Sequence, residues 1–172
     1  MSEEADMQSD PIIQLTDVCK QFGDLRVLKN ISLSVTPGES SVIMGGSGSG
    51  KTVLLKHIAG LLSPDSGTVE VKGLDLADLD DDELDRLRLS MGYLFQSGAL
   101  FDSMTVYQNL DFVMDRHTDL GTAERRDRIE EALNWVDLPD KIRQYPAELS
   151  GGQQKRIALA RAIILEPEIL LY

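Results

Sequence analysis

Hydrophobic positions along the chain switch between short β-type runs and longer runs at helical spacing, which predicts an α/β fold. The β-type runs alternate or cluster β-forming residues and are separated by turn signals such as Thr36-Pro37-Gly38-Glu39. They predict strands at residues 12–18, 31–35, 40–44, 68–71 and 91–95. After the third of these runs, apolar residues recur at helical spacing, namely Leu54, Leu55, Ile58, Leu61 and Leu62. The first half is therefore expected to open with β structure and to continue as strand, loop and helix.

From residue 101 onward the pattern becomes mainly helical. One predicted helix places four apolar residues on a single face, and these are Val106, Leu110, Val113 and Met114. A charged helix over residues 123–136 turns Ile129, Ala132, Leu133 and Val136 inward, and a third helix covers residues 154–165. Trp135 is expected to act as a packing anchor among these helices. Residues 97–165 thus approximate an inserted helical subdomain.

An acidic tract over residues 75–88 permits two interpretations. It contains six aspartates, which is compatible with a metal site. However, the cluster at residues 80–83 precedes apolar residues and arginines in the order typical of a helix start, where acidic side chains favour the positive end of the helix dipole. No spacing of the calcium-loop type is present. We therefore favour a solvated helix N-terminus over a metal site.

A glycine-rich loop between the predicted strand at 40–44 and the following helix indicates nucleotide binding. Its sequence, Gly45-Gly46-Ser47-Gly48-Ser49-Gly50-Lys51-Thr52, fits the phosphate-binding pattern G-x-x-x-x-G-K-[ST]. Glycines let backbone N–H groups surround a phosphate chain, Lys51 supplies charge to the β- and γ-phosphates, and Thr52 offers a hydroxyl to Mg²⁺. The expected ligands are therefore ATP or a similar nucleotide, and Mg²⁺.

Composition narrows the class of partner. The chain has 172 residues, 17 Lys and Arg against 29 Asp and Glu, and a net charge of −12, which argues against binding to nucleic acid. The single cysteine, Cys19, suits a reducing compartment and is expected to be a small buried or half-buried apolar residue rather than a catalyst. Residues 1–10 resemble neither a signal peptide nor an anchor and are expected to be a disordered lead-in. No stretch is apolar enough for a membrane span, so a membrane role would be peripheral.

A second candidate anion site opens the helix over residues 154–165. Leu149-Ser150-Gly151-Gly152-Gln153 combines a good N-cap serine with paired glycines that let another molecule approach the backbone. The simpler alternative is a capped helix with no ligand. Because the same chain also contains a complete phosphate loop, we expect the two motifs to act together.

The pairing of residues 45–52 with residues 149–153 closely resembles the ATPase subunit of ATP-binding-cassette (ABC) transporters, over about Ile12 to Tyr172. The resemblance implies a P-loop NTPase (RecA-like) core with an N-terminal antiparallel β subdomain, an inserted helical subdomain, and a cassette spanning residues 11–172. It also implies a head-to-tail homodimer, in which ATP on the phosphate loop of one subunit is capped by Ser150, Gly151, Gly152 and Gln153 of the other.

Two further roles come from the resemblance alone. Phe22 matches the aromatic residue that stacks on adenine, although its sequence context alone suggests a core residue. Gln96 matches the glutamine that helps to hold Mg²⁺ or the attacking water and reports the nucleotide state to an integral membrane permease. Lys51 and Gln96 are thus the catalytic candidates, and Thr52 and Gln96 the metal ligands.

A narrower resemblance links the chain to the branch that serves phospholipid transport with Mce-type lipid-binding proteins, the Mla-type system. It rests on residues 95–106 and on Val53, which stands where most transporter ATPases place a second hydroxyl. The branch implies lipid transport across the cell envelope and a cytoplasmic location on the inner face of the inner membrane. The alternatives are an importer ATPase for another solute and a soluble ABC ATPase outside transport.

The strand expected at residues 168–172 is followed in the family by an aspartate for Mg²⁺, a catalytic glutamate and a later switch histidine, none of which is present. His57 and His117 lie at other positions and are expected at the surface. C-terminal truncation is the simplest explanation, with natural degeneracy as the alternative. On this view the full-length parent hydrolyses ATP, whereas the 172-residue piece turns over essentially none.

Overall fold

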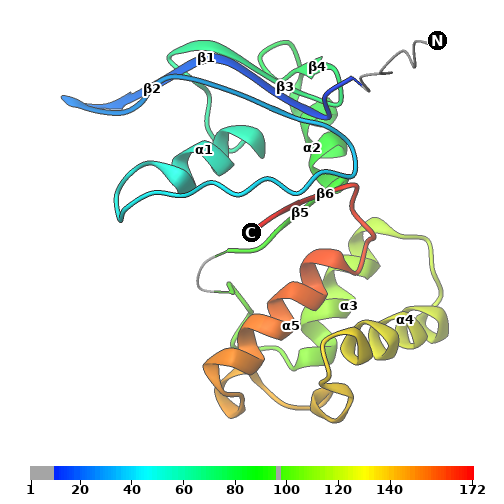
Figure 1. Ribbon diagram of the computed structural model, residues 1–172. Coiled ribbons are helices and arrows are strands. Elements are labelled where there is room, and N and C mark those ends of the chain that lie inside the picture. The colour runs from blue at the N-terminus through cyan, green and yellow to red at the C-terminus, as the bar shows by residue number, and fades with distance from the viewer. Residues whose placement is uncertain (1–9, 96–97) are drawn as a thin grey trace, which may run out of the picture. The chain divides into compact units, whose positions relative to one another are not determined.

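The computed structural model describes residues 10–95 and 98–172. The chain divides into two compact units, the first ending at Asp85 and the second beginning at Arg86. Figure 1 shows the elements of each unit. Each unit has its own set of buried apolar side chains, so each is described by itself.

The first unit is built on a four-stranded antiparallel sheet (Figure 1). Its strands are β1 (Ile13–Phe22), β2 (Leu25–Val35), β3 (Ser66–Val71) and β4 (Leu74–Asp75), in the order β2-β1-β3-β4. The predicted strands at 12–18, 31–35 and 68–71 are confirmed. Side chains of β1 and β3 form much of the core, since Leu15, Val18 and Val71 are fully buried. The burial of β1 does not alternate strictly, because an irregularity in the register separates Leu15 from Val18.

Helix α1 (Lys51–Ile58) packs against this sheet through Leu54 and Ile58. It ends earlier than its apolar spacing predicts, because Gly60 adopts a left-handed conformation with φ of +64°. The backbone N–H of Leu61 then bonds to the carbonyl of Lys56 and closes the helix. The prediction that Leu61 and Leu62 continue the helical face is therefore wrong.

The segment at residues 40–44, expected to be a buried strand, forms no strand in the structure. Val42 and Met44 are 78% and 87% exposed. A parallel-type strand is stable only when neighbours supply hydrogen bonds along it, and within residues 10–95 and 98–172 no strand pairs with this segment. An apolar run alone could not reveal that missing neighbour.

The acidic tract forms the start of helix α2 (Asp81–Leu89). Asp80 accepts a hydrogen bond from the N–H of Glu83, whose carboxylate accepts one from the N–H of Asp80, at 2.8 Å and 3.0 Å. This reciprocal pair is a capping box, and the acidic first turn faces the positive end of the helix dipole. Among the described residues no group of three or more His, Cys, Asp or Glu is arranged to hold a metal ion. The predicted helix start is confirmed by α2 and its capping box.

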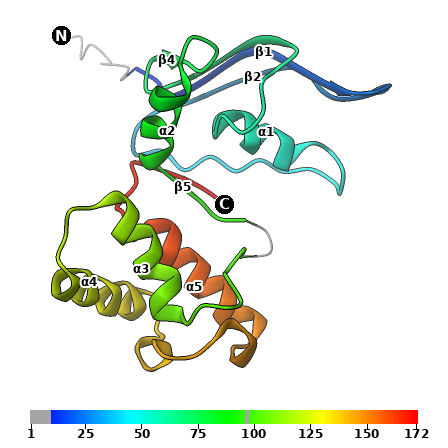
Figure 2. The ribbon, with the colours of Figure 1, turned by 180° about the vertical axis from the view of Figure 1, so that it is seen from behind.

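The second unit combines a short parallel sheet with a helical cluster, seen from behind in Figure 2. Strands β5 (Met91–Tyr93) and β6 (Ile169–Leu171) pair in parallel. The helices are α3 (Val106–His117), α4 (Thr122–Trp135) and α5 (Gly151–Ile163), with 3-10 turns η1 (Pro139–Lys141) and η2 (Pro146–Glu148). The three α-helices correspond to the three that the sequence pattern predicted, although α5 begins three residues before the predicted start at 154 and ends two residues before the predicted end at 165.

Side chains from α3, α4 and α5 share one core, which includes Leu110, Ile129, Leu133 and Ile157. Val113 is only partly buried, whereas the other predicted members of its face are fully buried. Trp135 is 47% exposed, so its predicted role as a packing anchor is wrong. Helix α4 already buries its stripe at Ile129 and Leu133, and a residue two positions beyond Leu133 points away from that stripe.

Candidate nucleotide-binding site

The glycine-rich loop is open to solvent at its centre. Residues 45–49 are exposed, and Gly50 and Lys51 are partly buried. No side chain caps α1, and its first backbone bond runs from the N–H of Leu54 to the carbonyl of Gly50. The N–H groups of the first helical turn therefore have no acceptor inside the helix, and their dipole favours an anion.

Lys51 folds back over this loop. Its ammonium group donates to the carbonyls of Gly45 and Gly46, both at 2.8 Å. A cation held at the loop by neutral carbonyls is placed where phosphate oxygens would be stronger acceptors. Thr52, in the same first turn, is exposed, as a hydroxyl that holds Mg²⁺ must be.

Two glycines are required by the loop conformation. Gly48 has φ of +76° and Gly50 has φ of +94°, values that L side chains rarely adopt. A Cβ on Gly50 would lie 2.9 Å from Val27 Cγ1 and 3.1 Å from Leu28 Cδ2. The end of the loop therefore packs directly against β2.

Phe22 lies on the same β1–β2 hairpin that Gly50 touches. It pairs with Leu25 at the hairpin end, beside a two-residue turn in which Gly23 has φ of +56°. Phe22 is 45% exposed, and the ammonium of Lys20 lies 5.7 Å from the centroid of its ring. The exposed face suits stacking on an aromatic base and does not fit the core residue that its sequence context alone suggested.

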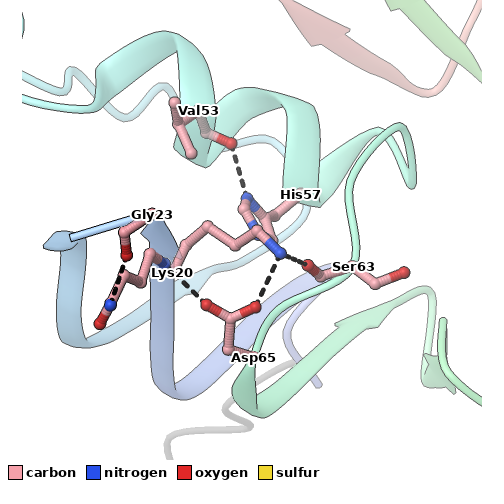
Figure 3. Close-up of polar contacts among 7 residues, drawn as sticks. Lys20, Gly23, Val53, His57, Ser63 and Asp65 are labelled. Atoms are coloured by element: carbon pink, nitrogen blue, oxygen red, sulfur yellow. Dashed lines mark hydrogen bonds and ion pairs between the residues drawn. The ribbon is translucent and has the colours of Figure 1, made fainter. Parts of the chain in front are cut away.

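A polar cluster fixes the hairpin to the turn after α1 (Figure 3). Lys20 donates to the carbonyl of Ser63 and to Asp65, both at 2.8 Å, and Asp65 also accepts from the N–H of Gln21 at 2.7 Å. The Lys20 hydrogen bond, followed by that of Gln21, holds the pKa of Asp65 below its usual value of 3.8. The cluster thus anchors the strand that presents Phe22.

His57 is fully buried on α1, so the prediction that it lies at the surface is wrong. Its Nδ1 lies 2.7 Å from the carbonyl of Val53 (Figure 3). A carbonyl only accepts, so Nδ1 carries the proton, and Nε2 is buried without a hydrogen-bond partner in the described structure. His57 follows Leu54 by three residues and therefore shares its inward face. His117, by contrast, is exposed as predicted.

The second motif forms a capped helix N-terminus on α5. Ser150 accepts from the N–H of Gln153 at 3.3 Å, and the Gln153 side chain accepts from the N–H of Ser150 at 2.8 Å. Gly151 and Gly152 are exposed, and a Cβ on either would meet nothing within 4 Å. The serine holds the helix end, and the two glycines leave its N–H groups accessible to an external anion.

Phe22, the loop at residues 45–50, Lys51 and Thr52 all belong to the first unit, in which Gly50 lies against β2 of the hairpin that carries Phe22. Ser150, Gly151, Gly152 and Gln153 lie together in the second unit. Gln96, the remaining predicted catalytic and metal-binding residue, lies outside the described residues.

The sequence reasoning missed a groove beside α3. It has a volume of about 440 Å³ and is lined by Ser103, Met104, Gln108, Asp111, Phe112 and Asp115. We call it the acidic groove. Phe101 and Phe112, 42% and 43% exposed, meet edge to face beside it at 5.3 Å between ring centroids. Exposed aromatic residues that lie side by side are enriched in surfaces that bind another chain.

Comparison with known proteins places these sites in context. The family model described as ABC transporter matches residues 28–172. The chain is 41% identical over 159 residues to a probable ribonucleotide transport ATP-binding protein, mkl, from Mycobacterium leprae, covering 92% of this chain and 46% of that protein. It is 40% identical over 172 residues to the Arabidopsis thaliana protein TRIGALACTOSYLDIACYLGLYCEROL 3, chloroplastic, covering 95% and 49%. The chain thus spans about half the length of these curated relatives.

A solved structure matches the fold closely. A dimeric ATP-binding cassette in a post-hydrolysis state, bound to ADP and Pi, superimposes with a TM-score of 0.85 at 36% identity, over 92% of this chain and 72% of that one. The predicted fold class, a P-loop cassette with an antiparallel β subdomain and helices, is confirmed. No helix in the described part of the chain is both long and apolar enough to cross a membrane.

Proposed function

Because this chain belongs to the ABC transporter family, we propose that it is the ATP-binding part of a transporter subunit that hydrolyses ATP. The observation that carries the proposal is the presence of two open anion sites on one chain. One is the uncapped loop at residues 45–50 with Lys51 folded over it, and the other is the capped N-terminus of α5. To be enclosed, one nucleotide needs an anion site on each of two opposite sides. The two sites can come from two different copies of the chain.

The enclosure we propose is a head-to-tail homodimer. ATP lies on the phosphate loop of one copy, with adenine against Phe22, and Ser150, Gly151 and Gly152 of the second copy cover the terminal phosphate. Support comes from the open space over both glycines of α5 and from the dimeric state of the similar cassette that holds ADP and Pi. Members of this family bind ATP with Mg²⁺.

The chemistry assigned to this chain is positioning and charge stabilisation. Lys51 would exchange its two carbonyl partners for oxygens of the β- and γ-phosphates. The N–H groups at the start of α1 and at the partner copy's α5 would donate to phosphate oxygens as negative charge builds during hydrolysis. When bound, Mg²⁺ neutralises phosphate charge, and Thr52 is the described residue whose hydroxyl would hold it. Gln96 is proposed as a further metal or water ligand from its place in the sequence.

We propose that the subunit works with an integral membrane permease, on the inner face of the cytoplasmic membrane. The permease would contact the acidic groove, where exposed Phe112 and half-buried Met104 suit an apolar segment and Asp115 suits a basic one. Arg125 pairs with both Asp111 and Asp115, at 2.7 Å and 3.0 Å, so these three side chains together carry one net negative charge. That remaining charge favours a partner segment that carries Lys or Arg.

For the cargo we propose a phospholipid or related lipid, with an Mce-type lipid-binding protein as a further partner. The support is the sequence of residues 95–106, Val53, and the likeness to a plant protein whose name is that of a glycolipid. The likeness to a ribonucleotide transport protein supports the rival, an ATPase for another solute.

The test is ATP turnover by the complete protein, alone and with its permease in phospholipid vesicles. Lys51→Ala is expected to abolish turnover and lipid movement together. Lys56→Ala, on the same helix but outside the loop, is the matched control and should retain both. Turnover that survives Lys51→Ala would contradict the proposed site. If ATP turnover is stimulated by a ribonucleotide other than ATP and not by phospholipid, the cargo is a ribonucleotide and not a lipid.

A further inference from the structure

Arg161, on the third turn of α5, reaches across to a segment about 60 residues earlier in the chain. Its Nη2 donates to the carbonyls of Gly98 and Ala99, at 3.1 Å and 2.9 Å, and its Nη1 lies 3.5 Å from Asn109 Oδ1. Its guanidinium carbon also lies 5.6 Å from the centroid of the Phe101 ring. One side chain thus contacts Gly98, Ala99 and Phe101 in the segment that leads into the acidic groove.

The backbone of this segment needs such external support. Gly98 has φ of +76°, and Ala99 has φ of +48°, a conformation that alanine avoids. A Cβ on Gly98 would lie 3.4 Å from the Cβ of Ala158, so the segment also packs closely on α5. The two carbonyls that Arg161 holds belong to these two residues. Arg161 therefore stabilises a strained turn that local sequence does not favour.

Asn109 extends the network from Arg161 to the rim of the acidic groove. It is fully buried, and its side chain accepts from the N–H of Phe101 at 2.8 Å. It also donates to the carbonyls of Phe101, Met104 and Thr105 at 3.0–3.1 Å. Met104 lines the groove, and Phe101 contacts Phe112 at its edge. A continuous set of hydrogen bonds and ring contacts therefore joins the groove wall to α5.

Placing a charged side chain at position 161 has an unfavourable free energy of desolvation. Arg161 is partly buried, and within the described residues its hydrogen bonds go to three neutral oxygens. Burial lowers the pKa of its guanidinium from the usual value. An apolar side chain of similar length would pack without this desolvation cost. An apolar residue could not supply the planar set of N–H donors with which the Arg161 guanidinium binds the two carbonyls.

We propose that Arg161 is a positioning residue that couples the acidic groove to the signature loop, residues 149–153. The Arg161 contacts make the groove wall and α5 move as one body. A permease segment that presses on residues 101–104 would then shift the N-terminus of α5, where Ser150 and the two glycines meet ATP. This coupling rests on the proposed function, since it assigns the groove to the permease and the N-terminus of α5 to ATP.

The test uses the complete protein, alone and with its permease in phospholipid vesicles. Arg161→Met removes the donors and keeps the length of the side chain, and Arg161→Lys restores charge without the planar fork. Arg156→Met is the matched control, because Arg156 lies on the same helix and donates instead to the carbonyl of Val136 at 2.9 Å. Two quantities are measured: permease stimulation of ATP turnover, and hydrogen exchange at the Phe101 amide.

Arg161→Met is expected to lower permease stimulation by about tenfold or more, the usual range of coupling between sites, while turnover without the permease stays within about twofold. Exchange at the Phe101 amide should accelerate by about tenfold or more, because its acceptor Asn109 loses support. On both measurements Arg161→Lys should fall between the unmodified protein and Arg161→Met. If Arg161→Met does not fold, Arg161→Lys is the variant that tests the proposal. Arg156→Met should match the unmodified protein.

Full stimulation in both Arg161 variants, or unchanged exchange at Phe101, would overturn the inference. If the unmodified protein shows no ATP turnover or no stimulation, the proposed function fails instead. The exchange measurement then still decides whether Arg161 holds the segment at residues 98–101.

Discussion

The glycines of the phosphate loop offer a graded test of the structure, because three of them meet different surroundings. Gly46 has an ordinary φ and open space, Gly48 has φ of +76° and open space, and Gly50 has φ of +94° with Val27 and Leu28 in the way of a Cβ. Substitution by alanine therefore adds no strain at Gly46, backbone strain at Gly48, and backbone strain together with steric overlap at Gly50.

The magnitudes follow from these three situations. Alanine in place of glycine stabilises by about 0.4–1 kcal/mol where the backbone permits it, through the unfolded chain. A left-handed conformation costs about 1–2 kcal/mol for a residue with a Cβ. Overpacking adds about 1–3 kcal/mol. Relative to the unmodified protein, Gly46→Ala should gain about 0.5 kcal/mol, Gly48→Ala should lose about 1 kcal/mol and Gly50→Ala about 3 kcal/mol.

Urea unfolding followed by circular dichroism measures this series. For a slope of about 2 kcal/mol per molar urea, Gly50→Ala should lower the midpoint by about 1.5 M. The reasoning fails if Gly50→Ala is as stable as Gly46→Ala, because the contact of the loop with β2 would then be absent in solution.

Three further predictions concern other parts of the molecule. The folded state depresses the pKa of Asp65. Its contact with Lys20 therefore stabilises the fold fully at pH values above the usual aspartate pKa, and this stabilisation is lost as the pH falls through the depressed pKa. Asp65→Asn should therefore lower the thermal midpoint at neutral pH and converge with the unmodified protein in acid; equal midpoints at neutral pH would refute this role. His57→Ala should cost about 2 kcal/mol in urea unfolding, whereas His57→Leu, which also removes the unpartnered nitrogen, should be neutral or up to about 1 kcal/mol more stable. A loss under 0.5 kcal/mol for His57→Ala would instead fit a surface residue, for which about that much is usual. Phe112→Ser should reduce co-purification with the permease and leave the ATP affinity unchanged; undiminished co-purification would remove the acidic groove as the docking surface.

Sequence periodicity predicted those elements whose stability is mostly local. Helix α4 was expected at residues 123–136 and occurs at Thr122–Trp135, since its apolar stripe and charged face specify it without a neighbour. The capping box at Ser150 and Gln153 likewise fixes the start of α5. The strand expected at residues 40–44 failed because its partners, and not its own residues, decide whether it forms.

The candidate site divides in the same way. The phosphate loop at residues 45–52 could be predicted from spacing, because the glycines and the lysine that would contact phosphate all lie within one short segment of the sequence. The burial of His57 was also readable, three residues after Leu54 on an inward face, but its polar character pointed to the surface. Arg161 could not be predicted, because its acceptors lie some 60 residues away on a turn that only the folded chain creates.

The most direct test of the composite site is ATP turnover by a mixture of two inactive copies. Lys51→Ala disables the phosphate loop, and Ser150→Arg blocks the opposing helix end while leaving nucleotide binding by the single copy intact. In an equimolar mixture half of the dimers pair unlike copies, and each of these has one intact site. The head-to-tail arrangement predicts that either variant alone is inactive and that the mixture recovers about a quarter of the normal turnover, if sites act independently and pairing is random. A mixture as inactive as its components would contradict a site shared between two copies.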